Sequence, residues 1–432
     1  MRLLGTIGIL GIGLAVLASA ETKPTPRTFT KDVAPILQAR CQTCHRPGEA
    51  APMSLLTYQE ARPWAKAIKE AVLLKRMPPW FADSSVGHFK NDRSLSQSEI
   101  GTLVSWVDTG AQEGDAKDLP AALNFVTGWN IGEPDLVLEM PQAFDVPAGG
   151  TVDYQYVILP QKFPEDRWVQ AAEVRPGARS AVHHVIAFIR EPGSKWMRDK
   201  TPGIPFVPDA NEKGDRPSIT GDMLAGYAPG VPAVQLAPGQ GRLVKAGSDI
   251  VFQLHYTANG KPAQDRSKVG VVFCKTPPAT RVMTLAASNS RFTIPPGDPN
   301  YKVESQLELA HDVTLRALAP HMHLRGKDFE YRLIFPTGEQ QTILRVPRYD
   351  FNWQLWYTPE EDMLLPKGTK VACTAHFDNS LNNPANPDPS KAVKFGEQSW
   401  EEMMIGFFDV AFDAKLDPKL LLPEKKSPRS GD

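Results

Sequence analysis

Two stretches decide the fold of most of this chain: residues 183–189, His-His-Val-Ile-Ala-Phe-Ile, and residues 250–256, Ile-Val-Phe-Gln-Leu-His-Tyr. Both are short apolar runs rich in β-branched and aromatic residues, and each carries histidine near one end. Runs of this length and composition are typical of strands. Similar runs recur at residues 331–335 and 405–412, between turns rich in proline and glycine. The pattern predicts antiparallel β-sandwich structure from about residue 130 onward.

The length of this strand-rich part predicts two domains. About 285 residues exceed the roughly 100 that one sandwich needs. We expect a first jelly-roll-like sandwich over residues 132–278, a second over residues 279–413, and a C-terminal tail over residues 414–432. The chain has 432 residues, which leaves room for a further small domain in front of them.

The N-terminus reads MRLLGTIGILGIGLAVLASAET and has the parts of a secretory signal. Arg2 supplies the positive charge, a short apolar run follows, and Ala18-Ser19-Ala20 supplies small residues for cleavage. We predict a signal peptide over residues 1–20, bacterial-type export to the periplasm or the medium, and no membrane span in the mature chain. An uncleaved membrane anchor is the alternative.

The balance of charges disfavours polyanionic partners. The 48 Lys and Arg residues are balanced by 49 Asp and Glu residues, and no block of like charge stands out. Nucleic acids and anionic membrane surfaces are bound through basic patches. We therefore expect neither as the main partner.

Residues 41–45 read Cys-Gln-Thr-Cys-His, a C-x-x-C-H motif that indicates covalent haem attachment. Two thiols three positions apart can form thioethers to both vinyl groups of a haem, and the next imidazole then faces the iron. We predict one haem c, bound through Cys41, Cys44 and His45. A redox dithiol or half of a zinc site is the alternative, which the adjacent histidine and the export signal disfavour.

Short amphipathic helices are predicted around this motif. Apolar residues have helical spacing just before it and again at residues 64–72. Ser96 and Glu99 form a capping box ahead of a third helix, which Gly110 closes. Over residues 22–118 the chain resembles a class I cytochrome c domain, which is small and all-α.

That resemblance implies a second axial ligand to the haem iron. Met77 is the leading candidate, because it lies between two predicted helices, where this family places its ligand, and precedes the stiff segment Pro78-Pro79-Trp80. Met53 and His88 are the rivals.

Histidines gather in the strand-rich part, which holds seven of the nine in the chain. His321 and His323 are two positions apart, so on a strand both side chains project to one face and can bind one ion. His183 and His184 are adjacent, and adjacent strand residues point to opposite faces. These two can share an ion only at a bend or bulge. His255 ends another apolar run.

A thioether follows later in the chain. Met403 comes after Glu401-Glu402 and opens the last apolar run. Imidazole is a ligand for copper, zinc, iron or nickel, and a thioether beside two imidazoles favours Cu(I). A lone histidine on a strand is more often structural.

The ordered set HH, Q-L-H-Y, H-M-H and E-E-M spans residues 132–413 and resembles the copper type II, ascorbate-dependent monooxygenases. This family includes peptidylglycine α-hydroxylating monooxygenase and dopamine β-monooxygenase. The resemblance implies two copper ions in separate sites, which in the family face each other across an open, solvent-filled cleft. The electron-transfer copper would be held in the first sandwich by His183, His184 and His255.

The dioxygen-binding copper, where catalysis takes place, would be held in the second sandwich by His321, His323 and Met403. His311 and His376 match no ligand of the family, and we expect them to be structural.

The sequence departs from the family at several positions. The peptide-amidating branch binds its substrate carboxylate with an Arg where this chain has Ala319, and it has Asn and Tyr where this chain has Ile405 and Phe407. A peptidylglycine substrate is therefore disfavoured. The animal enzymes also pair a Cys after the ligand Met with a second Cys, at the position of Cys373.

That disulfide cannot form here, because Met404 stands at the first of these two positions. Cys274 and Cys373 could pair with each other or stay free.

These features together predict an exported haem- and copper-containing monooxygenase that hydroxylates a small-molecule or peptide substrate with O2. The haem would relay electrons from a periplasmic donor to the copper ions. A non-enzymatic periplasmic electron-transfer or copper-binding cytochrome is the first alternative. A docking scaffold with structural histidines is the second.

Overall fold

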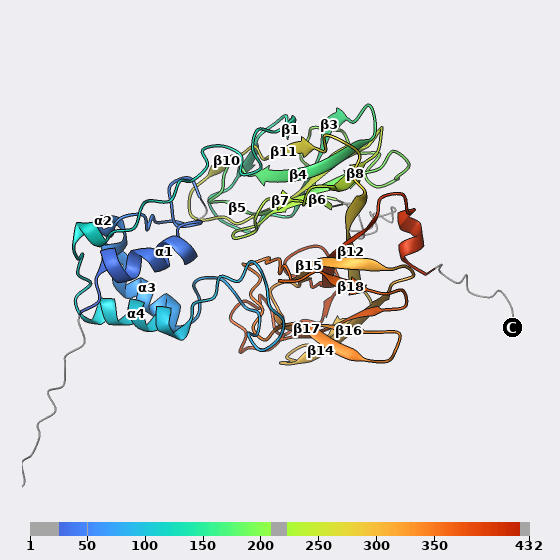
Figure 1. Ribbon diagram of the computed structural model, residues 1–432. Coiled ribbons are helices and arrows are strands. Elements are labelled where there is room, and N and C mark those ends of the chain that lie inside the picture. The colour runs from blue at the N-terminus through green and yellow to red at the C-terminus, as the bar shows by residue number, and fades with distance from the viewer. Residues whose placement is uncertain (1–25, 50, 209–222, 424–432) are drawn as a thin grey trace, which may run out of the picture.

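The computed structural model describes residues 26–49, 51–208 and 223–423. It has a small helical region at one end and two layered β structures beside it, one above the other in Figure 1. The expected signal peptide over residues 1–20 lies outside the described residues and stays a prediction. Within the described ranges, no helix is long and apolar enough to cross a bilayer.

The helical region (residues 26–118) consists of short helices around a small core of its own. The predicted capping box is present, since Ser96 and Glu99 each accept a hydrogen bond from the other's backbone N–H. Trp106, which the apolar pattern did not include, is fully buried, whereas Trp64, which it did include, is 44% exposed. The helices are η1 (Phe29–Val33), α1 (Ala34–Arg40), α2 (Tyr58–Ala61), η2 (Arg62–Trp64), α3 (Ala65–Leu73), α4 (Gln97–Asp108) and η3 (Ala116–Asp118).

The first β-sandwich contains both stretches that decide the fold, and they pair with each other as antiparallel neighbours. Its inner sheet has the order β3 (Gln155–Lys162), β9 (Asp249–Tyr256), β5 (Val182–Arg190) and β6 (Met223–Tyr227). This sheet packs against β1 (Leu136–Glu139), β11 (Lys268–Phe273), β4 (Arg167–Arg175), β7 (Val234–Gln235) and β8 (Gln240–Val244). A short pair, β2 (Phe144–Val146) and β10 (Ala263–Asp265), completes it.

The second β-sandwich follows the same plan. One sheet has the order β14 (Tyr301–Glu308), β19 (Lys370–Phe377), β16 (Gly326–Ile334) and β17 (Gln340–Val346). It packs against β12 (Thr280–Asn289), β21 (Met404–Asp413), β15 (Val313–His321) and β18 (Met363–Leu365). A short pair joins β13 (Thr293–Ile294) to β20 (Val393–Lys394). The expected tail begins with a packed turn, η4 (Pro418–Leu421), whose Leu421 is buried in this core.

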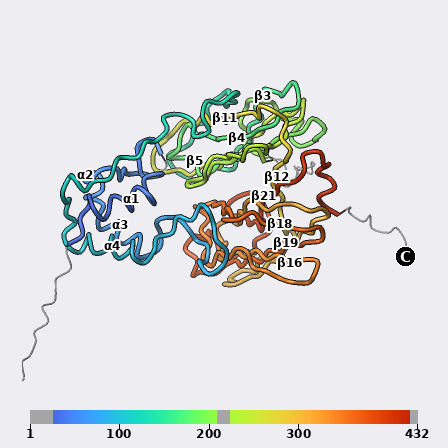
Figure 2. Tube along the Cα trace, in the orientation of Figure 1, coloured from blue at the N-terminus to red at the C-terminus, as the bar shows by residue number. Residues whose placement is uncertain are grey.

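One sheet runs through both sandwiches, which the sequence did not predict. Strand β12 pairs in parallel with β8 through Thr280 and Arg281, and so joins the two halves into a nine-stranded sheet. Across the same junction, the buried Arg242 guanidinium forms an ion pair with Asp409 and donates to the Thr284 hydroxyl. The two sandwiches are therefore held at a fixed orientation, side by side in Figure 2.

The helical region is attached to both sandwiches. Phe81, in the irregular segment after α3, is buried in the core of the second sandwich. Arg348 of that sandwich donates to the Lys75 carbonyl at 2.7 Å. On the other side, Arg179 of the first sandwich forms an ion pair with Glu49.

A buried ion pair stabilises the first sandwich. Arg190 donates two hydrogen bonds of 2.7 Å to the Asp249 carboxylate, and both side chains are at most 4% exposed. We expect Asp249→Ala to lower the free energy of unfolding by about 3–5 kcal/mol, because the arginine charge stays buried without its partner. Urea denaturation of the variant and the parent protein measures this difference.

Glu191→Ala is the matched control. Its partner Lys245 lies in the same sandwich, but both side chains are at least 40% exposed. Loss of this pair should change the free energy of unfolding by about 0–1 kcal/mol. Equal effects of the two substitutions would contradict a structural role for the buried pair.

Candidate functional site

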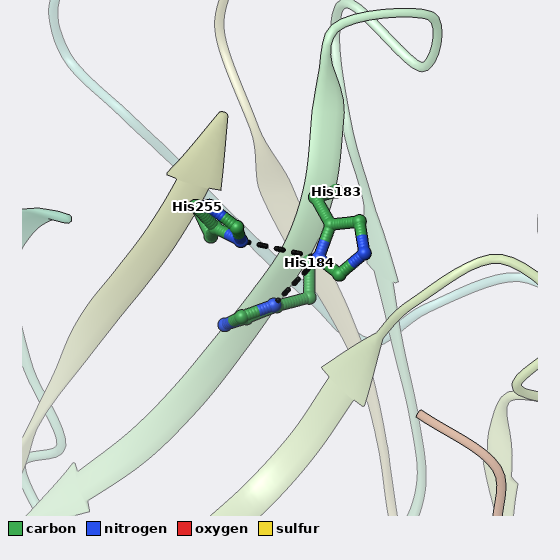
Figure 3. Close-up of side chains that lie close together, drawn as sticks. All are labelled: His183, His184 and His255. Carbon is green, nitrogen blue, oxygen red and sulfur yellow. Dashed lines mark hydrogen bonds between the residues drawn. The ribbon is translucent and has the colours of Figure 1, made fainter. Parts of the chain in front are cut away.

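Three histidines of the first sandwich converge on one point. His183 and His184 come from β5 and His255 from the neighbouring β9, and their rings turn toward one another in Figure 3. One ring nitrogen of each lies within 4.8 Å of the others. The expected grouping of these three residues is present in the structure.

A β-bulge makes this grouping possible. The β5–β9 register pairs Val182 with Tyr256 and then His184 with His255, which leaves His183 as the extra residue. A bulge rotates the following side chain relative to a regular strand, so two adjacent histidines can face the same space. The irregularity that the sequence required for a shared site is therefore confirmed.

The nitrogen spacing is that of ligands around one ion. His183 Nδ1 lies 3.2 Å from His184 Nδ1 and 3.1 Å from His255 Nδ1. Two nitrogens about 2.0–2.1 Å from one ion lie roughly 2.9–3.5 Å apart at angles of about 90–120°. A single imidazole nitrogen has either one hydrogen or one lone pair, so hydrogen bonding cannot satisfy both contacts of His183.

The surroundings keep these imidazoles neutral. Burial lowers the pKa of His183 to about 4 and that of His255 to about 3, and it lowers the pKa of His184 well below its ordinary value. Neutral imidazole is the form that binds metal ions. The remaining nitrogen of His183, Nε2, is buried and has no hydrogen-bond partner in the described part of the chain.

A second pair of histidines lies at the end of β15. The rings of His321 and His323 are 5.2 Å apart and nearly perpendicular. His321 Nδ1 lies 2.8 Å from Gln354 Oε1, and His323 Nδ1 lies 3.2 Å from the Glu401 carbonyl. Both oxygens are acceptors, so each Nδ1 donates and each Nε2 carries the lone pair. The Nε2 atom of His323 is buried and unpartnered among the described residues.

Glu402 joins this pair to the segment that carries Met403. Its buried carboxylate accepts hydrogen bonds from the backbone N–H groups of His323, at 2.9 Å, and Arg325, at 2.6 Å. Burial raises the pKa of Glu402 to about 8. His321 pairs with Ile405 across the β15–β21 ladder, which brings the end of β15 beside the segment that carries Met403, two positions before Ile405.

A single aromatic ring contacts both histidine groups. Phe351 stacks on His183 with centroids 5.0 Å apart, and it meets His323 edge-to-face at 5.8 Å. The family resemblance implies an open, solvent-filled cleft between the two sites. In this structure they instead approach each other through a packed phenylalanine.

The C-x-x-C-H motif lines a cavity of about 390 Å³ that also reaches the first histidine group. Cys41, Cys44, His45 and Met77 border it from the helical region, and His183 borders it from β5. His45 Nδ1 donates to the Met53 carbonyl at 3.3 Å, which leaves Nε2 as its lone-pair nitrogen. Binding sites for drug-sized ligands and cofactors have volumes of about 300–1,000 Å³.

The three candidate axial ligands lie in different surroundings. Met77 borders the cavity opposite the motif, Met53 packs against the core of the helical region, and His88 is exposed. This placement favours Met77, whose ligation stays a prediction. Among the other predicted features, His376 Nδ1 lies 2.7 Å from Asp328 Oδ1, His311 is exposed, and none of the four cysteines forms a disulfide with another.

Sequence reasoning missed several residues of these sites. Phe351 and Gln354 come from an irregular loop after β17, and Ser399, whose Oγ lies 3.2 Å from His255 Nε2, comes from the loop before β21. Tyr154 packs against His255 at 4.5 Å. None of them belongs to a motif, so no local pattern could have indicated their roles.

Comparisons with known proteins add little to this description. No protein-family model matches the sequence, and no curated protein sequence matches it. The major capsid protein P2 of bacteriophage PM2 is 10% identical, covering 65% of this chain and 98% of its own, with a TM-score of 0.28. The VP2 subviral particle of infectious bursal disease virus is 12% identical, with coverages of 70% and 76% and a TM-score of 0.18.

A tandem CBM22 domain of Xyn10C from Paenibacillus barcinonensis is 11% identical, with coverages of 66% and 100% and a TM-score of 0.14. TM-scores this low establish no common fold with any of these three proteins. The sites must therefore be interpreted from their own geometry.

The first histidine group makes a direct prediction about metal binding. His255→Ala should remove one equivalent of bound metal, because two imidazoles alone leave the site a ligand short. Titration with Cu(II), followed by metal analysis after desalting, measures the stoichiometry. His376→Ala, which removes a histidine outside both groups, should leave it unchanged. Retention of the full stoichiometry by His255→Ala would rule out this site.

Proposed function

We propose that the protein is an exported copper monooxygenase with a covalently attached haem c. The overall reaction would be R–H + O2 + 2 e⁻ + 2 H⁺ → R–OH + H2O, so two electrons enter for each substrate hydroxylated. Bound copper would supply the activation of O2 and one-electron redox chemistry, and the haem would accept electrons from a periplasmic donor.

The observation that carries this proposal is the shared cavity. Its lining includes the C-x-x-C-H motif on one side and His183 on the other. A haem attached at Cys41 and Cys44 would therefore lie directly against a member of the first histidine group. This arrangement gives an electron-carrying group in the helical region a short route to the sandwiches.

The residues around the cavity fit a haem. His45 and Met77 both border the cavity and would hold the haem iron, and a thioether ligand would raise the haem potential. Arg40, Arg93 and Arg179 also border the cavity, and guanidinium groups complement the two propionates of a haem. On this proposal the helical region is a small cytochrome c domain.

The two histidine groups fit copper in different roles. His183, His184 and His255 would hold the electron-transfer copper through their Nδ1 atoms. The second ion would be held by His321, His323 and Met403, where the thioether favours Cu(I), the oxidation state that reacts with O2. Glu402 and Gln354 orient the two histidines of this second site.

Packed side chains connect the two groups. His183 borders the haem cavity and stacks on Phe351, and Phe351 contacts His323. Electrons would thus pass from the helical region to the second sandwich through van der Waals contacts, without a solvent gap.

The same ring favours one alternative function. Because Phe351 packs against both His183 and His323, a substrate has no room between these two residues, and a non-enzymatic electron-transfer cytochrome that binds copper needs none. This alternative predicts copper uptake and reversible reduction, with no O2 consumption for any substrate.

Metal content gives the first test. Purified holoprotein should contain one iron and two copper ions per chain, measured by elemental analysis together with the pyridine haemochrome spectrum. Cys41→Ala with Cys44→Ala should remove the covalent haem and leave copper unchanged, because the sandwiches supply every copper ligand. Iron without copper in the parent protein would exclude the proposal.

Electron relay gives the second test. Haem reduced under anaerobic conditions should reoxidise at least tenfold faster on mixing with O2 when both copper sites are loaded. Met403→Ala should abolish this acceleration and leave the haem spectrum intact, because the thioether lies in the second sandwich. Stopped-flow absorbance follows the haem, and His376→Ala serves as the control. An unchanged rate in Met403→Ala would contradict the assignment of the second copper site.

A further inference from the structure

A small pocket is bordered by one histidine of each group and is distinct from the cavity of the C-x-x-C-H motif. His184 of β5 and His321 of β15 both border it, and its volume is about 60 Å³. One water needs at least about 10–15 Å³ of such space, so the pocket has room for a few atoms of a ligand. It is the place where a substrate would reach the second copper site.

Resting on the function proposed above, we propose that the substrate is an uncharged organic molecule whose reacting C–H lies on an apolar end seated in this pocket. The pocket walls carry the argument. They are formed by apolar side chains and by neutral polar ones, with no Asp, Glu, Lys or Arg among them. A charged group would lose its hydration there without gaining an opposite charge.

Two walls of the pocket are positions where this chain departs from the peptide-amidating enzymes. Ala319 and Phe407 border the pocket, on the neighbouring strands β15 and β21, and they pair across the ladder. Two of the three positions at which the sequence departs from these enzymes therefore lie side by side in the wall of this pocket. An alanine and a phenylalanine provide no cation and no hydroxyl for a substrate carboxylate.

The side-chain amide of Gln354, which borders the pocket, already has hydrogen-bond partners at both of its polar atoms. Gln354 Oε1 accepts from His321, and Gln354 Nε2 donates to the Phe351 carbonyl at 2.8 Å. Trp356 and Val231 provide further apolar wall. The lining thus contains no Asp, Glu, Lys or Arg side chain, and the Tyr227 hydroxyl is its one buried hydrogen-bonding group without a partner among the described residues.

A larger cavity of about 270 Å³ adjoins the pocket. The two share Met223, Gly226, Val231 and Trp356 as lining residues, so a longer molecule can extend from one into the other. The outer cavity is polar, because Arg242 and Asp409 border it as an ion pair.

One N–H donor of this ion pair, at Arg242 Nε, is not used by Asp409. Arg242 is only 4% exposed, and its Nε has no hydrogen-bond partner in the described part of the chain. Arg316 also borders this cavity. Arg242 is paired with Asp409 and Arg316 with Asp362, so each guanidinium already has an opposite charge, which favours an uncharged oxygen over a carboxylate as the acceptor. The substrate would therefore have a hydroxyl or carbonyl oxygen at the end remote from the reacting C–H.

A matched pair of probes tests the substrate class. 3-Phenylpropan-1-ol is uncharged, and 3-phenylpropionate has the same ring and chain but ends in a carboxylate. Isothermal titration of the haem-loaded full chain, without copper, should give a Kd at least tenfold lower for the alcohol. Equal or tighter binding of the carboxylate would overturn the proposal.

Variants of the walls show whether binding takes place in this pocket. Ala319→Leu fills it from β15, and Val231→Trp narrows it from a partly buried loop position. Each should weaken alcohol binding at least tenfold. Ala122→Leu, at an exposed position far from the walls, should leave it unchanged. Alcohol binding that neither wall variant weakens would refute the pocket assignment.

The same measurements separate this inference from the proposed function. Binding is measured without copper and without turnover, so it can fail while copper loading and haem reoxidation succeed, which would refute the substrate class alone. Conversely, alcohol binding that depends on Ala319, in a protein that takes up no copper, would refute the monooxygenase and leave an uncharged-ligand pocket. On copper-loaded protein, bound alcohol should also perturb the Cu(II) electron paramagnetic resonance spectrum.

Discussion

The pairing of β8 with β12 holds this molecule together. It merges one sheet of each sandwich into a single nine-stranded sheet, and the buried ion pair between Arg242 and Asp409 crosses the same junction. Because backbone hydrogen bonds fix the register, the two sandwiches cannot rotate freely about a linker. His184 and His321 therefore both border one small pocket. The two histidines are 137 positions apart in the sequence, and their strands do not pair with each other.

Loops then complete what the sheet positions. The segment before β21 contacts both histidine groups, through Ser399 at His255 and through the Glu401 carbonyl at His323. Phe351 lies between the groups from a different loop. A change in the conformation of either loop would therefore alter both histidine groups. These loops thus connect the two sandwiches in addition to the sheet that they share.

The helical region belongs to this arrangement and is not an appendage. Its C-x-x-C-H motif faces His183 across one cavity, while Phe81 is buried in the core of the second sandwich. Anchoring at both sandwiches keeps the motif at a set distance from the first histidine group. A redox group attached to a freely moving domain would lack this fixed contact.

The sequence by itself determined the features that depend on local spacing. The strand runs, the capping box at Ser96, the adjacent and alternating histidines, and the need for a bulge at His183 all follow from the periodicity of neighbouring residues. Only the tertiary structure decided that one sheet joins the sandwiches, that Phe351 contacts both histidine groups, and that His183 borders the same cavity as the C-x-x-C-H motif. These are contacts between residues far apart in the chain, and such contacts leave no periodic trace in the sequence.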